Sequence, residues 1–192
     1  EGALIWHCDR GPEDEGRSIQ AVADERGQTP EDVALDILLE VHGEVDMVQF
    51  AMDETNVEMG LSVPFVMIGS DGEGRAATGR MSTGKPHPRN YGTFPRVLGY
   101  YARQRGLFSL ETAVRKMTGQ SADRLDLHDR GYVRPGYFAD ITVFDPNRVI
   151  DRATFSNPHQ YADGIEYVLV NGRPALWQGE HTGALPWQVL SR

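Results

Sequence analysis

Length, composition and charge narrow the class of protein. The chain has 192 residues, 40% of them hydrophobic, which allows one or two domains with a sizeable core. Its formal charge of −9 argues against a nucleic-acid-binding protein, because such a protein needs a basic face for the phosphates. No apolar run approaches about 18 residues and no signal-peptide pattern occurs, so we expect no membrane contact and a cytoplasmic location.

The amino-terminal residues carry two further indications. Cys8 is the only cysteine, so no internal disulfide can form, which fits a reducing compartment. We expect Cys8 to be a small buried hydrophobe rather than a nucleophile, since free cysteine is among the most buried residue types. The apolar run at 3–8 has no turn before it, so we expect the chain to begin inside a strand, with further sequence upstream.

The first half of the chain predicts helices that alternate with strands. Thr29 can cap a helix that ends at Gly43. A strand is then expected at 47–52, a helix at 54–61 and a second strand at 63–68. The last run is too short for a helix and apolar throughout, as in a strand buried on both faces. This order predicts a parallel sheet with right-handed crossovers.

The second half begins with helices and ends with strands. Residues 72–93 are rich in glycine and irregular, and helices are predicted at 95–104 and 109–117. Alternating apolar residues then predict a strand at 139–143. Asn171-Gly172, a strong hairpin signal, joins two further strands at 165–170 and 173–178.

Asp71 is the first candidate for a catalytic residue. It follows the apolar run at 63–68, with glycines at positions 69 and 72. At the carboxyl end of a buried parallel strand, a carboxylate lies on the catalytic face of a barrel and can act as a general base. The alternative is a tight Asp-Gly turn, which is a frequent hairpin signal. No second strand follows directly, and this favours the catalytic interpretation.

The irregular residues 72–93, which we call the cationic segment, are positive within an acidic chain. They contain Arg75, Arg80, Lys85 and Arg89 against one acid, Glu73. Such a segment next to Asp71 could bind an anionic substrate group such as a carboxylate, which arginine can hold with two hydrogen bonds. The alternative is a solvated loop or an interface with an acidic surface.

Two further patterns in the sequence fail as binding motifs. Residues 79–85 have the spacing of a phosphate-binding loop, but Pro86 stands where Ser or Thr would hold magnesium. Pro86 and Pro88 also favour extended backbone instead of a helix start. The six histidines show neither His-x-His nor His-x-x-x-His spacing, so no complete metal site can be assigned to this chain. We expect these histidines, His159 among them, to have structural or surface roles.

Several short motifs together resemble the carboxyl-terminal part of the N-acyl-D-amino-acid deacylases, a branch of the metal-dependent amidohydrolases. They lie at 67–72, 84–89, 91–99, 115–118, 129–131, 135–145, 158–161 and 164–172. Gly-Lys-Pro-His-Pro-Arg at 84–89 and Pro-His-Gln-Tyr at 158–161 point to this branch. The Gly-Tyr-Phe-Ala-Asp-Ile portion within 135–145 is shared more widely among amidohydrolases.

The resemblance implies roles for several residues. Asp71 matches the aspartate that ends the eighth barrel strand, which takes a proton from the attacking water and passes it to the leaving amine. Zinc would polarise the amide carbonyl and lower the pKa of that water. Lys85, Arg89 and Arg80 are the candidates to hold the substrate carboxylate. The family's zinc ligands are expected upstream of this chain, because nothing in it replaces them.

The resemblance also implies an α/β architecture. Residues 1–125 would be the carboxyl-terminal part of a (β/α)8 barrel, and 126–192 a small β domain. A whole barrel needs roughly 250 residues, so we expect a piece of a larger enzyme, inactive alone and paired with a missing amino-terminal part. Two other hypotheses stay open: a different amidohydrolase, hydantoinase-like or dipeptidase-like, and a non-catalytic interaction module.

Overall fold

The computed structural model describes residues 2–8 and 12–190, which divide into two compact units. Unit 1 takes in the described residues of Glu1–Asp53, Asp71–Tyr91 and Arg152–Tyr161. Unit 2 takes in the described residues of Glu54–Ser70, Gly92–Asp151 and Ala162–Arg192. Each unit is therefore built from segments that are distant in the sequence.

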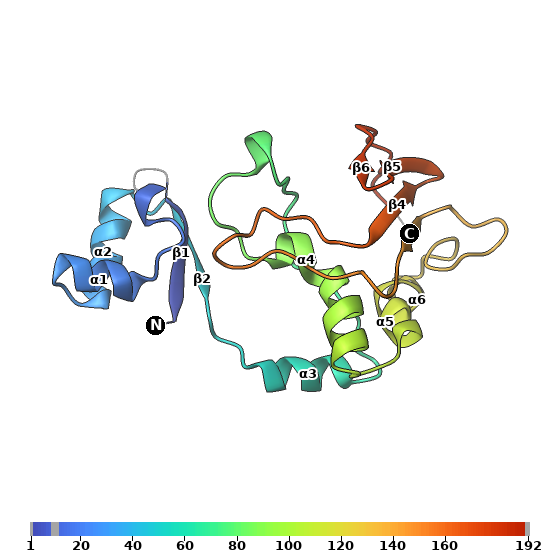
Figure 1. Cartoon of the computed structure of the whole chain (residues 1–192), viewed down its shortest axis with the longest axis horizontal. Coiled ribbons are helices and arrows are strands. Elements are labelled where there is room, and N and C mark those ends of the chain that lie inside the picture. Colours follow the sequence, from blue (N-terminus) through green and yellow to red (C-terminus); the bar gives the residue numbers. More distant parts are fainter. Residues whose placement is uncertain (1, 9–11, 191–192) are drawn as a thin grey trace. The chain divides into compact units, whose positions relative to one another are not determined.

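Unit 1 has two strands and two main helices, which lie beside each other in Figure 1. Its elements are β1 (Ala3–Cys8), η1 (Pro12–Asp14), α1 (Ile19–Arg26), α2 (Pro30–Glu40), β2 (Val45–Gln49) and the short turn η2 (Gly79–Met81). Their buried core consists of Ile5, Cys8, Val22, Ala23, Val33, Ile37 and Val41. Cys8 is 3% exposed and free, which confirms the prediction of a small buried hydrophobe.

Capping side chains fix where the helices of unit 1 begin. The Thr29 hydroxyl accepts a hydrogen bond from the backbone N–H of Asp32 at 3.2 Å, which confirms the predicted start of α2. The helix α1 was not predicted, although it is capped in the same way by Ser18, whose hydroxyl accepts from Ala21 N at 3.1 Å. Such caps satisfy backbone donors that have no partner inside the helix.

The prediction of a parallel arrangement is wrong for the strands of unit 1. β1 and β2 pair antiparallel, with Leu4 opposite Val48 and Cys8 opposite Val45. The cause of the wrong strand direction is α1, the helix that was not predicted. One crossover helix returns the chain to the starting end of a strand, whereas α1 and α2 together bring it back at the end where β1 finished.

Unit 2 combines a group of helices with an antiparallel sheet. Its helices are α3 (Glu54–Ser62), most of α4 (Arg89–Arg96), the π-helix η3 (Val97–Gln104), α5 (Leu110–Met117) and α6 (Gly119–Arg124). Its strands are β3 (Ile141–Phe144), β4 (Ile165–Val170), β5 (Arg173–Trp177) and β6 (Glu180–His181). Buried side chains of η3, Ala113 of α5 and Val149 form its core.

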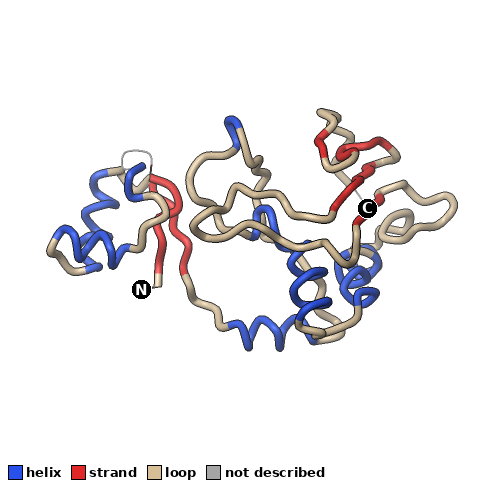
Figure 2. The backbone as a smooth tube through the Cα atoms, in the orientation of Figure 1, coloured by secondary structure: helices blue, strands red, loops and turns tan. Residues whose placement is uncertain are grey.

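No strand forms at 63–68, so that prediction is also wrong. Figure 2 shows loop from the end of α3 to α4, apart from η2. The hydrogen bonds of this segment go to Lys116 of α5 instead of to another strand. Its ammonium donates to the carbonyl oxygens of Val63 and Val66 at 2.5 and 2.9 Å, and its own carbonyl accepts from Ile68 N at 3.2 Å. An apolar run becomes a strand only where a neighbouring strand takes its backbone groups.

The helix predicted at 95–104 is longer than expected. It starts at Arg89, contains Pro95 and widens into the π-helix η3. Gly99 of η3 packs against the backbone of residue 149: a Cβ at Gly99 would lie 2.3 Å from the Val149 carbonyl oxygen. The helix predicted at 109–117 is confirmed, and the Ser109 hydroxyl caps it by accepting from Thr112 N at 3.2 Å.

The predicted hairpin is confirmed. β4 and β5 pair antiparallel through Asn171 and Gly172, which have φ values of +51° and +75°. Positive φ at both central residues is what a type I′ hairpin turn requires. Arg130 bonds to the side chains of Asp140 and Asn171 and so ties this turn to the start of β3.

None of the helices in the described part of the chain combines the length and the apolar character needed to cross a membrane.

Candidate active site

Asp71 lies in unit 1 at the start of the cationic segment, and its backbone is in an uncommon conformation. Its φ is +48°, in the left-handed region that aspartate tolerates better than most residues. Its carboxylate is 85% exposed and lies 3.0 Å from Nη2 of Arg89. Non-glycine residues with positive φ are frequent at functional sites, where the surrounding structure holds them. Asp71 is thus an exposed carboxylate with one fixed cationic neighbour.

Asn90 holds the backbone on the other side of Asp71. Its side-chain Oδ1 accepts a hydrogen bond from Glu73 N at 2.6 Å, and its Nδ2 donates to the carbonyl oxygen of His87 at 3.2 Å. Gly72 fits closely here, because a Cβ on it would lie 3.2 Å from Asn90 Oδ1. The two ends of the cationic segment are therefore joined next to the Asp71–Arg89 pair.

The cations of this segment fall into two groups. Arg75 is paired with Glu73 at 2.6 Å and lies over the Trp6 ring, with 5.3 Å between the guanidinium carbon and the ring centroid. Arg89 is paired with Asp71. Within the described chain, no carboxylate pairs with Lys85 or Arg80. These two residues are the positive charges of the segment that remain available to an anion.

The peptide that leads into Lys85 lies against β1. Lys85 N donates to the Trp6 carbonyl oxygen at 2.7 Å. Gly84 has a φ of +69°, and a Cβ on it would lie 3.0 Å from that same oxygen, so the approach requires glycine. The Lys85 stem passes Gly16, where an added Cβ would lie 3.3 Å from Lys85 Cγ. The course of the lysine is thus set by β1 and by the turn after η1.

His87 lies beside the Asp71–Arg89 pair and acts there as a hydrogen-bond acceptor. Its Nδ1 accepts from Arg89 N at 3.0 Å, and its ring packs edge-on against Phe155, with 4.9 Å between centroids. Burial lowers the pKa of His87, and the nearby Arg89 charge lowers it further, while Asp71 acts in the opposite direction. The neutral ring is the form that these contacts favour.

Sequence patterns did not reveal an apolar cavity in unit 1. It has a volume of about 360 Å³ and is lined by residues of β1, α1, α2 and β2, among them Met47, and by Phe50, which directly follows β2. The Phe50 ring packs on Phe155 with 4.7 Å between centroids, and Phe155 in turn contacts His87. A row of rings therefore connects the edge of this cavity with the residues around Asp71. In the sequence, the large apolar residues Met47 and Phe50 give a signal for it, and the structure leaves both exposed.

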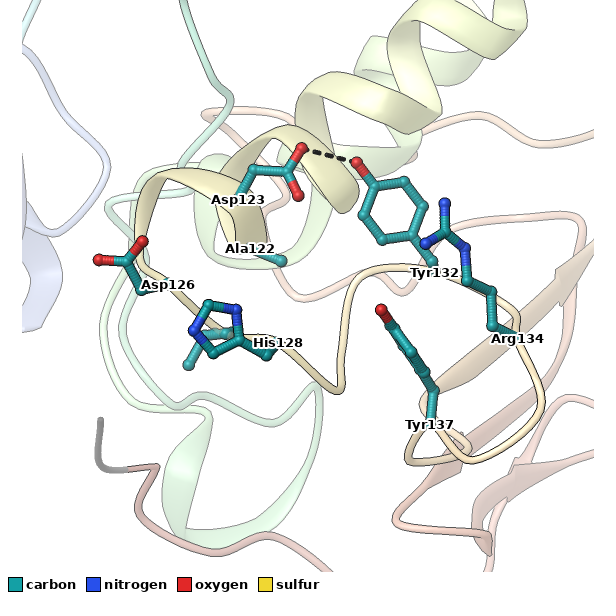
Figure 3. Close-up of a pocket in the computed structure, with 8 residues that line it drawn as sticks. Ala122, Asp123, Asp126, His128, Tyr132, Arg134 and Tyr137 are labelled. Carbon is teal, nitrogen blue, oxygen red and sulfur yellow. Dashed lines mark hydrogen bonds between the residues drawn. The ribbon is translucent and has the colours of Figure 1, made fainter.

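A second pocket, in unit 2, is polar, and two of its charged side chains contact Tyr132 (Figure 3). It has a volume of about 260 Å³. The Tyr132 hydroxyl donates to the Asp123 carboxylate at 2.7 Å, and the Arg134 guanidinium lies 4.6 Å from the centroid of the Tyr132 ring. The hydrogen bond to Asp123 raises the pKa of Tyr132. None of the predicted site residues lines this pocket.

The residues present do not form a complete metal centre. Among residues 2–8 and 12–190, no three side chains of His, Cys, Asp or Glu gather closely enough to hold a metal ion. The structure brings Asp71 and Arg89 together and places Lys85 and Arg80 on the same cationic segment. What these residues offer chemically is one exposed carboxylate and two cations that have no carboxylate partner within the described chain.

Comparison with known proteins defines the class. The amidohydrolase family model matches residues 66–176, which is more than half of the chain, so the chain belongs to the amidohydrolase family. The D-aminoacylase of Alcaligenes xylosoxydans xylosoxydans is 45% identical over 189 residues, which are 98% of this chain and 37% of that protein.

Solved structures show the same similarity. A crystal structure of D-aminoacylase superposes with a TM-score of 0.87 at 43% identity, over 100% of this chain and 38% of that one. An N-acyl-D-glutamate deacylase from Bordetella bronchiseptica, complexed with zinc and a phosphonate inhibitor that mimics the tetrahedral intermediate, superposes with a TM-score of 0.80 at 35% identity. That match covers 91% of this chain and 34% of the deacylase. The chain therefore spans little more than a third of the length of these relatives.

Proposed function

We propose that this chain is the carboxyl-terminal portion of a zinc-dependent hydrolase that converts N-acyl-D-amino acids to a carboxylate and a free D-amino acid. The similarity to D-aminoacylase over 98% of the chain supports the substrate class. The observation that carries the proposal is the exposed Asp71 carboxylate, held beside Arg89 in a left-handed backbone conformation. A general base needs such a positioned and accessible carboxylate.

In this proposal Asp71 handles the proton of the reaction. Its carboxylate accepts a proton from the water that attacks the amide carbon, and the same group then delivers that proton to the leaving amine. Arg89 keeps the carboxylate oriented through the contact at 3.0 Å. This arrangement increases the reaction rate, because one group that is already in place acts first as the base and then as the acid.

Lys85 and Arg80 are the residues that we assign to the substrate carboxylate. Of the three predicted candidates, Arg89 is occupied by Asp71, whereas no carboxylate within the described chain pairs with the other two. Cations without a partner gain most from an incoming anion, because they lose no existing ion pair. In this assignment Arg89 therefore orients the Asp71 carboxylate and does not itself contact the substrate.

The zinc ligands belong, in this proposal, to the portion of the enzyme that this chain does not cover, since the described residues form no cluster of three ligands. When bound, zinc supplies a Lewis acid for the amide carbonyl and lowers the pKa of a water molecule. Residues 1–125 would complete a (β/α)8 barrel together with that portion, and 126–192 would be a small β domain. A cytoplasmic location, to be checked by cell fractionation, is part of the same proposal.

The test is an Asp71→Asn substitution in the complete enzyme, assayed with N-acetyl-D-methionine. Turnover should fall by about 10²–10⁴-fold, the usual contribution of a positioned acid–base group, with folding and zinc content unchanged. Asp126→Asn is the matched control, because Asp126 is also exposed and has a φ of +58°. Wild-type turnover in Asp71→Asn would refute the assignment.

Two further assays separate the other hypotheses. Hydrolysis of a hydantoin or a dipeptide in preference to N-acetyl-D-methionine would indicate a different amidohydrolase. The 192-residue chain purified alone should carry no zinc and show no amidase activity, measured by atomic absorption and by release of the free amino acid. Stoichiometric zinc and hydrolysis by the chain alone would contradict the proposal that the ligands lie elsewhere.

A further inference from the structure

His87 accepts hydrogen bonds from the residues at the start of α4. Its Nδ1 accepts from Arg89 N at 3.0 Å, and its carbonyl oxygen accepts from Asn90 N at 3.1 Å. Tyr91 N donates to the carbonyl oxygen of Pro88 at 3.0 Å. Pro88 itself has no N–H, so every backbone donor of this first turn has its acceptor. His87 therefore occupies the place of a helix N-cap.

The two prolines beside His87 favour this geometry. A residue before proline is driven towards extended backbone, and this is the conformation of an N-cap residue. Proline is also favoured at the first helical position, because an N–H there would have no acceptor inside the helix. Pro86 is fully buried and anchors the chain just before the histidine. Pro-His-Pro-Arg at 86–89 is thus a helix start, with histidine where serine or asparagine is usual.

The imidazole ring is held with Nδ1 towards the helix. A backbone N–H can only donate, so Nδ1 must be the nitrogen without a hydrogen, and the neutral ring carries its proton on Nε2. The Phe155 ring packs edge-on against the imidazole, with 4.9 Å between centroids. Phe155 in turn packs against Phe50, with 4.7 Å between centroids. These two rings hinder the imidazole from rotating away from Arg89.

Arg89 and Asp71 are the charged groups that act on the ring. Burial lowers the pKa of His87, the Arg89 charge lowers it further, and Asp71 opposes them. The net shift favours the neutral ring, which is the only form that can accept through Nδ1. The charge of Arg89 thus helps to preserve the bond by which its own backbone is held.

The cap fixes Arg89 on the side opposite to its charge. Its N–H is bound by His87, and its guanidinium Nη2 lies 3.0 Å from the Asp71 carboxylate. Asn90, the next residue, accepts from Glu73 N at 2.6 Å and so fixes the chain just after Asp71. The first turn of α4 therefore supports both members of the Asp71–Arg89 pair. A shift of about 1 Å at a positioned group can cost a large factor in rate.

We propose that His87 is a positioning residue, whose neutral imidazole caps α4 and thereby holds Arg89 against Asp71. The inference rests on the proposed function, because it takes Asp71 to be the general base. His87 acts on the reaction through Arg89 and exchanges no proton with the substrate. The histidine of Gly-Lys-Pro-His-Pro-Arg at 84–89 then has a physical reason to be there.

Two substitutions in the complete enzyme separate the cap from the packing of the ring. His87→Asn keeps an acceptor oxygen at the place of Nδ1, and asparagine is a good N-cap, but most of the contact with Phe155 is lost. His87→Phe keeps a ring against Phe155 and has no acceptor. With N-acetyl-D-methionine, kcat/KM should fall about tenfold in His87→Phe, the equivalent of roughly one hydrogen bond. It should stay within about twofold of wild type in His87→Asn, and both variants should keep their zinc.

His181→Phe is the matched control. The Nδ1 of His181 also accepts from an N–H two residues further on, Gly183 N at 3.0 Å, but this turn lies in unit 2 and no helix follows it in the described part of the chain. This variant should keep the kcat/KM of wild type. A loss of about tenfold in His87→Asn would assign the effect to ring packing and overturn the inference. Wild-type kcat/KM in His87→Phe would show that the cap is not needed and would overturn it as well.

A double substitution tests whether His87 acts through Arg89. In an Arg89→Ala background, His87→Phe should lower kcat/KM by less than about twofold further, because the positioned side chain is already gone. Two full effects that multiply would show that His87 acts by another route, and would overturn the inference.

Amide hydrogen exchange provides a readout that needs no activity. Peptides covering 87–94 should exchange about tenfold faster in His87→Phe than in wild type or His87→Asn. An enzyme inactive on every N-acyl-D-amino acid would refute the proposed function, and exchange would still decide whether His87 caps α4. Unchanged exchange in His87→Phe would overturn the cap itself.

Discussion

Residues 63–70 run without regular secondary structure, and so does the cationic segment between η2 and α4, but different kinds of side chain hold their backbones. Residues 63–70 are held by Lys116, which is 2% exposed and donates to two carbonyl oxygens. In the cationic segment, the backbone is held by the amide of Asn90, the hydroxyl of Tyr91 and the imidazole of His159. The cationic side chains of that segment are more exposed than Lys116.

This difference shows why Lys116 has a structural role, whereas Lys85 is a candidate for binding. Burial of an ammonium group is costly unless acceptors surround it, and burial lowers the pKa of Lys116. Its hydrogens are directed at carbonyl groups and are not offered to a ligand. Lys85 lies on a backbone held by other groups, so its ammonium keeps the freedom to meet an anion.

The largest expected effect comes from removal of the buried cation. Lys116→Ala should lower the free energy of unfolding by about 2–4 kcal/mol, because it leaves a cavity and removes the donors to residues 63–70. Lys116→Met is the matched control. It fills most of the volume and should recover the larger part of the loss, since a buried charge is itself costly. Urea unfolding of the complete enzyme measures both, and a Lys116→Ala variant as stable as wild type would show that this lysine supports nothing.

A smaller effect, on binding instead of stability, is expected for the half-buried Lys85. Lys85→Ala should raise KM for N-acetyl-D-methionine about tenfold, or about 1.4 kcal/mol, with the free energy of unfolding unchanged. Arg75→Ala is the control, because the Arg75 guanidinium already forms an ion pair with Glu73. Steady-state kinetics with the carboxylate substrate and its carboxamide analogue check this prediction. Equal losses in the two variants would mean that net charge, and not Lys85, attracts the substrate.

The smallest effect is a dependence of stability on pH at the acidic side. Burial lowers the pKa of His87 from its usual 6.5. Between the lowered pKa and 6.5, the unfolded chain therefore binds a proton at this histidine and the folded chain does not. The stability from the neutral ring is therefore present above about pH 6.5 and is lost as the pH falls through the lowered pKa of the folded state. His87→Gln should flatten this part of the profile. Urea unfolding between about pH 7.5 and 5 measures it, and a drop of the same size in both proteins would assign it to other groups.

Part of this protein follows from the sequence alone, wherever the deciding contacts are local. Thr29 and Ser109 cap helices that begin at the next residue, and each accepts from an N–H three residues further on. Asn171-Gly172 makes the turn between β4 and β5. These predictions succeed because a cap or a two-residue turn depends on backbone groups only a few positions away. The family motifs can also be recognised in the sequence, and they include Asp71 and part of the cationic segment.

Only the tertiary structure decided how these parts are used. The apolar run at 63–68 had the composition of a strand, but its hydrogen bonds go to a lysine 50 residues further on. The choice among Lys85, Arg80 and Arg89 depended on which cation Asp71 had already paired with. His159 looked like an ordinary turn histidine until its ring was found against Gly84. Contacts between distant residues leave no periodic pattern in the sequence, and the folded chain alone brings such residues together.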